Sequence, residues 1–207
     1  MSQLWNEVFE MLIKSPNNIH VEKLIKYDNN ILKKLDINEN SVLGQIIANT
    51  SGIIVDNYIR VFANGDGINF QNIYTYNREL EKYFGNKILI VADDIWGGLY
   101  AINNGGFSEE QGKIWYFAPD TLKWDNLELS YPEFIAWISS NNLNEFYNSY
   151  KWVGFQKDIA EIKYNQGILI YPFLWSSECN IDDAEKKVVS FNELILLNLD
   201  YKKKFNL

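Results

Sequence analysis

Residues 87–125 read KILIVADDIWGGLYAINNGGFSEEQGKIWYFAPDTLKWD and decide the fold. They hold three apolar runs, at about 88–92, 99–103 and 113–118, rich in β-branched and aromatic residues. Runs of this length and composition are typical of buried strands. Gly, Asn and Asp fill the gaps between the runs, and short gaps of this kind permit tight reversals but no parallel crossover. The stretch therefore predicts an antiparallel meander at the centre of one sheet.

The rest of the chain predicts helices and further strands around this meander. Apolar residues recur at helical spacing after the first residues, and two pairs, Ser130 with Glu133 and Ser190 with Glu193, have the spacing of capping boxes. We expect strands near 53–62 and 168–174, and helices near 3–13, 42–50, 131–140, 143–151, 155–163 and 190–204. No linker or repeat interrupts the chain. The prediction is one α+β domain over residues 1–207.

Three segments outside these elements have weaker patterns. Residues 20–25 fit a short edge strand. Residues 65–84 have little periodicity and are interpreted as a long surface loop, a kind of segment that often carries function. Residues 175–188 are polar and acidic and are interpreted as a second loop.

The amino-acid composition limits the kinds of partner that the protein can bind. The chain has 207 residues, 47% of them hydrophobic and 15% aromatic, with a formal net charge of −8. An acidic protein lacks the Lys and Arg surplus that neutralises phosphates, so we expect no nucleic-acid partner. No apolar run approaches the roughly 20 residues that cross a bilayer, and the first residues lack a signal-peptide pattern, so we expect no membrane and a cytoplasmic location. The charge is compatible with a basic protein partner.

The usual catalytic templates are missing from the sequence. His20 and Cys179 are the only histidine and cysteine, so the chain can supply neither a disulfide nor the nitrogen and sulfur ligands of a zinc site. There is no G-x-S-x-G motif. The segment GFSEEQGK at 106–113 is a near miss to a phosphate-binding loop, with five residues between its glycines, Ile114 in place of Ser or Thr, and a strand instead of a helix after it. We expect no catalytic residue, cofactor or metal.

The turns of the meander hold the remaining candidates. Asp93 and Asp94 are adjacent, so their side chains diverge to opposite faces if the strand persists. A structural role, accepting bonds from turn amides, is favoured over catalysis or metal binding. Trp96 lies in the turn DDIWGG, where its side chain is either partly exposed beside the two aspartates or folded back over the sheet. Whether this turn and APDTLKW share one end of the sheet stays open. The candidate binding residues are Asp93, Asp94, Trp96, Gly97, Gly98, Asn103, Asp120, Trp124 and Trp175.

Several blocks also resemble a known family. VADDIWGGLYAINNG, GKIWYFAPDTLKWDNL, YPEFIAW, FYNSYKWVGF and YNQGILIYPFLW are similar, in this order, to an uncharacterised bacterial family catalogued as a domain of unknown function. With the upstream block NSVLGQIIANTSGIIVDNYIRVFANG, the likeness spans roughly residues 40–200. It implies no catalytic residues. Besides the candidates above other than Trp96, the resemblance marks Gly105, Tyr116, Phe117, Pro119, Gln166, Gly167 and Pro172 as distinctive positions.

A looser likeness links GGLYAIN, IWYFAPDTLKW and PEFI to the SUKH superfamily. This resemblance implies an α+β fold, and many of its members are immunity proteins that neutralise bacterial toxins. Two hypotheses follow. The first is a non-catalytic binding protein of immunity type, acting on a basic partner such as a toxin. The alternative is a small-molecule or metal-binding protein, or a hydrolase, using Asp93, Asp94 and Asp120 near Trp96. The identity of any partner and the oligomeric state stay open.

Overall fold

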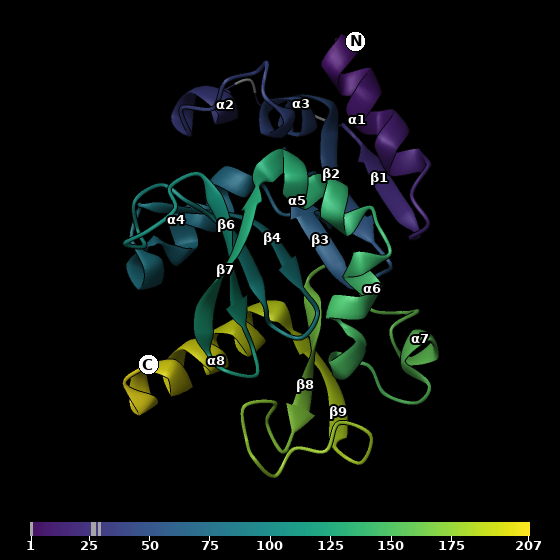
Figure 1. The fold of residues 1–207 in the computed structure, drawn as a ribbon, viewed down its shortest axis with the longest axis vertical. Coiled ribbons are helices and arrows are strands. Elements are labelled where there is room, and N and C mark those ends of the chain that lie inside the picture. The colour runs from purple at the N-terminus through teal and green to yellow at the C-terminus, as the bar shows by residue number, and fades with distance from the viewer. Residues whose placement is uncertain (1, 26–27, 29) are drawn as a thin grey trace.

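Seven strands in chain order form one antiparallel sheet (Figure 1). A computed structural model describes residues 2–25, 28 and 30–207. The α+β prediction is confirmed, and the central meander β4–β5–β6 lies where the apolar runs predict it. The strands are β1 (Ile19–Lys23), β2 (Thr50–Val55), β3 (Ile59–Phe62), β4 (Ile88–Asp94), β5 (Leu99–Asn103), β6 (Lys113–Ala118) and β7 (Lys123–Ser130).

Helices cover both faces of this sheet. One face packs against α5 (Tyr131–Ile138) and α6 (Asn142–Phe146), through contacts such as Tyr100 with Phe134. The other face packs against α4 (Ile73–Phe84) and α8 (Phe191–Phe205), through contacts such as Phe84 with Phe117. The β1 end of the molecule is covered by α1 (Gln3–Ile13) and α3 (Val42–Asn49), with α2 (Asn30–Lys34) beside them (Figure 1).

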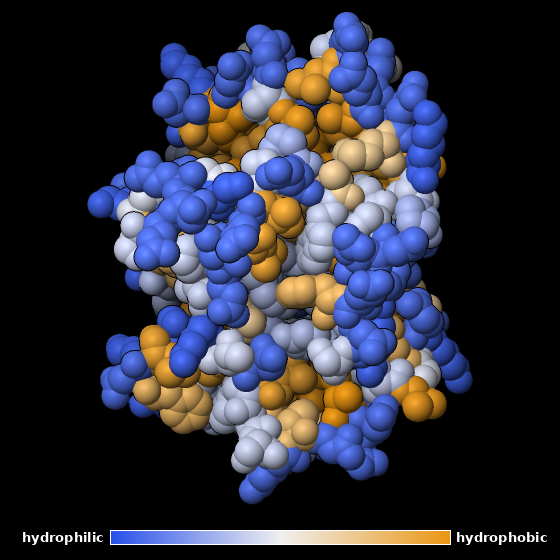
Figure 2. Space-filling view, in the orientation of Figure 1, coloured by the Kyte–Doolittle hydropathy of each residue, from blue (hydrophilic) through white to orange (hydrophobic). Residues whose placement is uncertain are grey.

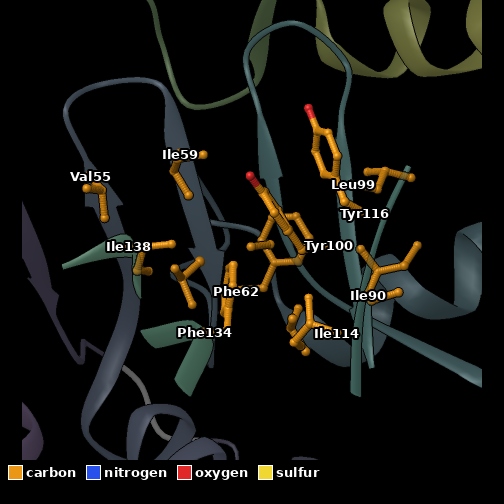
Figure 3. Packing of buried hydrophobic residues seen from close by; sticks show 14 of the residues in the cluster. Val55, Ile59, Phe62, Ile90, Leu99, Tyr100, Ile114, Tyr116, Phe134 and Ile138 are labelled. Carbon is orange, nitrogen blue, oxygen red and sulfur yellow. The ribbon is translucent and has the colours of Figure 1, made fainter. Parts of the chain in front are cut away.

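The core lies between the sheet and these helices. Val55, Ile59, Phe62, Ile90 and Leu99 are among the strand residues in it, and Phe134 and Ile138 of α5 belong to the same cluster (Figure 3). The start of α5 follows the predicted capping box, since both the backbone amide and the hydroxyl of Ser130 donate to the Glu133 carboxylate. The box fixes where β7 ends and α5 begins.

The predicted strand near 168–174 forms, but outside the main sheet. β8 (Gln166–Tyr171) ends directly before Pro172 and pairs with β9 (Glu185–Ser190) in a separate two-stranded sheet. The interpretation of residues 175–188 as one loop was therefore wrong for its last four residues. β9 has the sequence EKKVVS, whose polar, mostly exposed residues give no alternating apolar signal. β9 is a strand because its backbone pairs with that of β8.

The interpretation of residues 65–84 as a loop was wrong for its second half, which is helix α4. The Asn72 side chain accepts hydrogen bonds from the amides of Tyr74 and Thr75, and thereby caps the helix. Helix α4 has only three buried residues, Ile73, Tyr76 and Leu80, and many of its other residues are polar. A narrow apolar stripe of this kind suffices because the helix needs to cover only one strip of the sheet.

Two other predictions differ in extent. The helix expected over 143–151 is divided into α6 and a short 3₁₀ helix, η1 (Asn148–Tyr150), and the helix expected over 155–163 is only α7 (Phe155–Asp158). The segment near 20–25 is the edge strand β1, as predicted.

Candidate functional site

The turns that carry the candidate residues lie at one end of the sheet. Strands β4 and β6 run in the same direction, because each is antiparallel to β5 between them. Turns 95–98 and 119–122, which follow β4 and β6, are therefore neighbours, and this settles the question left open by the sequence. The two-stranded sheet joins the same end, since the Ile168 amide donates to the Ile95 carbonyl at 2.7 Å.

Asp94 is the centre of this end and is fully buried. Its Oδ1 accepts hydrogen bonds from the amides of Trp96 and Gly98, both at 2.9 Å. Its Oδ2 accepts from the hydroxyls of Tyr116 and Tyr147, both at 2.7 Å. Burial raises the pKa of Asp94, and the two tyrosine hydroxyls oppose that shift. Four donors therefore satisfy this carboxyl inside the protein, and we call Asp94 with Trp96, Gly98, Tyr116 and Tyr147 the Asp94 hub.

Asp93 points to the other face, as its adjacency to Asp94 predicts. Its partner is Arg60, the residue opposite it on β3, whose Nε donates to Asp93 Oδ1 at 2.5 Å. Both side chains are almost wholly buried. The same guanidinium donates to the carbonyl oxygens of Tyr164 and Gln166 and lies 4.5 Å from the centre of the Phe191 ring. Arg60 thus ties the main sheet to the segment leading into β8.

The protonation of Asp93 reflects two opposing effects. Burial raises the pKa of this carboxyl to about 7, against the opposing effect of the Arg60 guanidinium. Asp93 and Asp94 are both fixed by internal partners, on opposite faces of β4. Two carboxylates that diverge in this way cannot act on one reacting atom.

Trp96 is buried, so of the two alternatives left open by the sequence the folded-back side chain is the one observed. Only 1% of the residue is accessible. Its ring stacks between Tyr147, at 4.9 Å between centroids, and Phe155, at 5.3 Å. Both partners lie more than 50 residues further along the chain, so local sequence gives no sign of them. The large side chain in the turn fills the space between the sheet end and the α6–α7 segment.

The two glycines of the turn are required by close packing. A Cβ on Gly98 would lie 2.1 Å from Asp94 Oδ2 and 2.5 Å from the Tyr116 hydroxyl. Gly97 has φ of +93°, which disfavours other residues, and a Cβ there would lie 2.7 Å from the Asn198 side chain on α8. The GG pair permits the turn to close over the Asp94 hub.

Asn103 and Asp120 also bind within the protein. Asn103 Oδ1 accepts from the amides of Gly105 and Phe107, and its Nδ2 donates to the Glu109 carbonyl. These bonds hold the loop between β5 and β6 at the opposite end of the sheet. Asp120 is exposed and accepts from the Tyr150 hydroxyl at 2.7 Å. The structure thus brings Asp93, Asp94, Trp96, Gly97, Gly98 and Asp120 to one end and leaves Asn103 at the other.

The last two candidates are partly buried tryptophans in separate aromatic groups. Trp124 packs against Phe84, Phe107 and Phe117, on the α4 side of the sheet. Trp175 belongs to a group with Phe173, Tyr201 and Phe205, which joins the segment after β8 to the end of α8. Neither lies in the Asp94 hub.

The sheet end has no room for a substrate. The hollow that Trp96 lines together with Asn198 and Trp175 has about 10 Å³ of open space, which is about the size of one water molecule. Among residues 2–25, 28 and 30–207, no three His, Cys, Asp or Glu side chains are grouped to hold a metal ion. In this conformation the arrangement stabilises the fold and leaves no space for a reacting molecule.

A larger hollow lies elsewhere, between α4 and α8, and the sequence interpretation missed it because α4 itself was missed. It measures about 630 Å³ and adjoins a second hollow of about 280 Å³. Figure 2 shows apolar surface over the C-terminal end of α8, at the lower left. We call both hollows together the α4–α8 groove. It is lined chiefly by Glu79, Leu80, Lys82, Tyr83, Phe84, Ile195, Leu196, Leu199, Asp200, Lys202 and Lys203.

The length and apolar character of the helices bear on whether one of them could cross a membrane. Over the part of the chain that the structure describes, none of them combines the length and the apolar character needed to cross a bilayer.

Comparison with known proteins places the chain among uncharacterised bacterial proteins. A family described as "Protein of unknown function DUF2625" matches residues 2–194. The uncharacterized protein YbfG of Escherichia coli is 31% identical over 176 residues, which are 84% of this chain and 80% of that protein. An uncharacterized protein of Haemophilus influenzae is 31% identical over 177 residues, 81% of this chain and 75% of its own. No solved structure matches.

Proposed function

Because the chain belongs to the bacterial family of unknown function DUF2625, which gives no activity to inherit, we propose from its own structure that it is a non-catalytic protein-binding module. The observation that carries the proposal is the burial of the Asp94 hub. The acidic turn that could have held a reacting group is closed, and its carboxyl has four internal donors. The protein then acts through its surface, where a partner can bind.

The finer proposal is an immunity-type role, in which the protein binds and neutralises a basic toxin. The looser likeness to the SUKH superfamily supports it, and so does the net charge of −8. The main buried acids are Asp93 and Asp94, so most of the negative charge lies at the surface. An acidic surface attracts a basic partner over roughly 8 Å at physiological salt and accelerates their encounter.

Co-expression with the product of a neighbouring gene tests this proposal. We expect the protein to restore growth to cells that express a toxic, basic neighbour, and the two purified proteins to form a complex in size-exclusion chromatography with light scattering. The affinity should fall as salt is added, because the attraction is electrostatic. If no neighbouring product binds, or if the protein degrades or modifies the toxin instead of binding it, the proposal is wrong.

The alternative is a small-molecule or metal-binding protein, or a hydrolase, that uses Asp93, Asp94 and Asp120 near Trp96. It rests on the position of these residues at one end of the sheet, with Asp93 on the opposite face of β4 from Asp94. A thermal-shift screen with divalent metals and metabolites tests it, with Asp94→Asn as the control variant. A ligand that raises the melting temperature of the wild type and leaves that of Asp94→Asn unchanged would support the alternative over the binding module.

A further inference from the structure

The α4–α8 groove has an apolar centre. Leu80, Ile195 and Leu199 are buried and form its floor. Tyr83, 44% exposed, and Leu196, 42% exposed, stand on its two sides, one on each helix. Isolated exposed apolar residues are common on protein surfaces, but these two face one hollow from neighbouring helices. The groove thus offers an extended apolar surface to a partner.

The rim of the larger hollow is cationic. Lys82, Lys202 and Lys203 line it, and Asp200 is its one acidic residue among those described. Asp200 is paired with Lys204 at 2.6 Å, so its charge is already compensated. Lys202 also donates to the Leu122 carbonyl, which holds this ammonium beside the groove. A local surplus of lysines on a chain of net charge −8 is the reverse of the overall balance.

The shape and charge together select one kind of occupant. A hollow between two helices, with an apolar floor and polar edges, is the geometry in which an amphipathic helix binds by residues at i, i+3, i+4 and i+7. Lysines along the rim favour carboxylates on the flanks of that helix. We propose that the α4–α8 groove binds an acidic amphipathic helix of another protein, leucine-rich on its buried side.

This surface goes beyond the proposed function, because a basic toxin would be attracted by the acidic remainder of the molecule and repelled by these lysines. The two proposals can fail separately. The toxin complex tests the protein-binding function, and a separate ligand tests the groove.

A library of displayed random peptides of about 16 residues, four to five helical turns, provides that ligand. Selection on the wild-type protein should enrich peptides with leucine or phenylalanine at helical spacing and Asp or Glu beside them. The double variant Tyr83→Ser with Leu196→Ser should lower the affinity of a selected peptide at least about tenfold in fluorescence anisotropy. Val153→Ser, which changes an apolar residue that is 90% exposed elsewhere, should leave it unchanged.

Charge reversal separates the acidic helix from other occupants. Lys82→Glu with Lys203→Glu should weaken the selected peptide about tenfold, whereas Lys157→Glu with Lys187→Glu, the same charge change at exposed lysines away from the groove, should not. The proposal is overturned if no peptide is enriched, if the enriched peptides are basic or extended, or if groove substitutions leave binding intact. Self-association that Tyr83→Ser with Leu196→Ser abolishes would also overturn it, by making a second copy the occupant.

Discussion

The Asp94 hub and the α4–α8 groove contrast in every property that matters for function. The hub gathers acids, aromatics and glycines, yet its side chains are buried and its carboxyl is satisfied by four donors. The groove has no concentration of reactive groups, yet it has open volume and exposed apolar side chains. Residue types associated with chemistry here mark a structural centre, and a surface for binding lies where the residue types are ordinary.

The largest expected effect is the loss of stability on removing the hub carboxyl. Asp94→Ala leaves two backbone amides and two tyrosine hydroxyls without their buried acceptor, which should cost about 3 kcal/mol or more of the free energy of unfolding. Asp120→Ala, at an exposed acid with one tyrosine partner, should cost about 1 kcal/mol. Urea denaturation measures both. Equal losses in the two variants would remove the distinction between the hub and the surface.

Crowding the hub should produce the next largest effect. Gly98→Ala introduces a Cβ within 2.1 Å of Asp94 Oδ2, so the turn or the carboxyl must move. Overpacking of this kind costs about 1–3 kcal/mol. The measurement is again urea denaturation, with near-ultraviolet circular dichroism to report on the surrounding tyrosines and Trp96. An alanine accepted without loss of stability would mean that the hub is loosely packed.

The buried acids also predict a pH dependence with a definite sign. The pKa of Asp93 is raised to about 7, well above its value near 3.9 in the unfolded chain. Between about pH 4 and pH 7 the folded protein therefore binds a proton that the unfolded chain lacks, and the free energy of unfolding should fall as pH rises. The slope from this group is at most about 1.4 kcal/mol per pH unit. Asp94, whose pKa is also raised, acts in the same direction.

Asp93→Asn tests the assignment of this slope. The amide oxygen can still accept from Arg60, so the fold keeps the contact while losing the titration. Urea denaturation at a series of pH values should show a flatter dependence in Asp93→Asn than in the wild type. If wild-type stability does not fall between about pH 4 and pH 7, Arg60 holds the carboxyl ionised and burial is the weaker effect, because a lowered pKa would change the stability only near and below the unfolded value of about 3.9.

The smallest effect is expected at the groove. Tyr83→Ser with Leu196→Ser removes two partly exposed side chains, and surface substitutions of this kind usually change the free energy of unfolding by about 0.5 kcal/mol or less each. The same denaturation experiment measures it. A loss of unfolding free energy as large as that of Asp94→Ala would mean that Tyr83 and Leu196 support the core and are not free to bind a partner.

The fold could be predicted where its signals are local. Apolar runs separated by short turns gave the meander β4–β5–β6, and Ser130 with Glu133 gave the start of α5. Helix α4 was missed because its apolar stripe is narrow, and β9 was missed because a polar strand forms only through pairing with β8. Long-range pairing of this kind leaves no local pattern.

The candidate site, like the fold, could be predicted only where its features follow from local sequence. The divergence of Asp93 and Asp94 and the use of a carboxyl to bind turn amides both follow from the geometry of a strand and its turn, and both are observed. The sequence could not decide between exposure and burial of Trp96, because the rings that cover it come from Tyr147 and Phe155, far along the chain. Position within a turn does not determine exposure when a distant segment packs over that turn.

Hydrogen exchange at the amides of Trp96 and Gly98 tests most directly whether the Asp94 hub is a closed structural centre. Both amides donate to Asp94 Oδ1, so in a closed hub they exchange only when the protein unfolds as a whole. We predict protection equal to that of the central strand β4, and a free energy of opening equal to that of global unfolding. Exchange of these two amides through a local opening, while β4 stays protected, would contradict the account, because it would show a site that admits solvent as a catalytic site must.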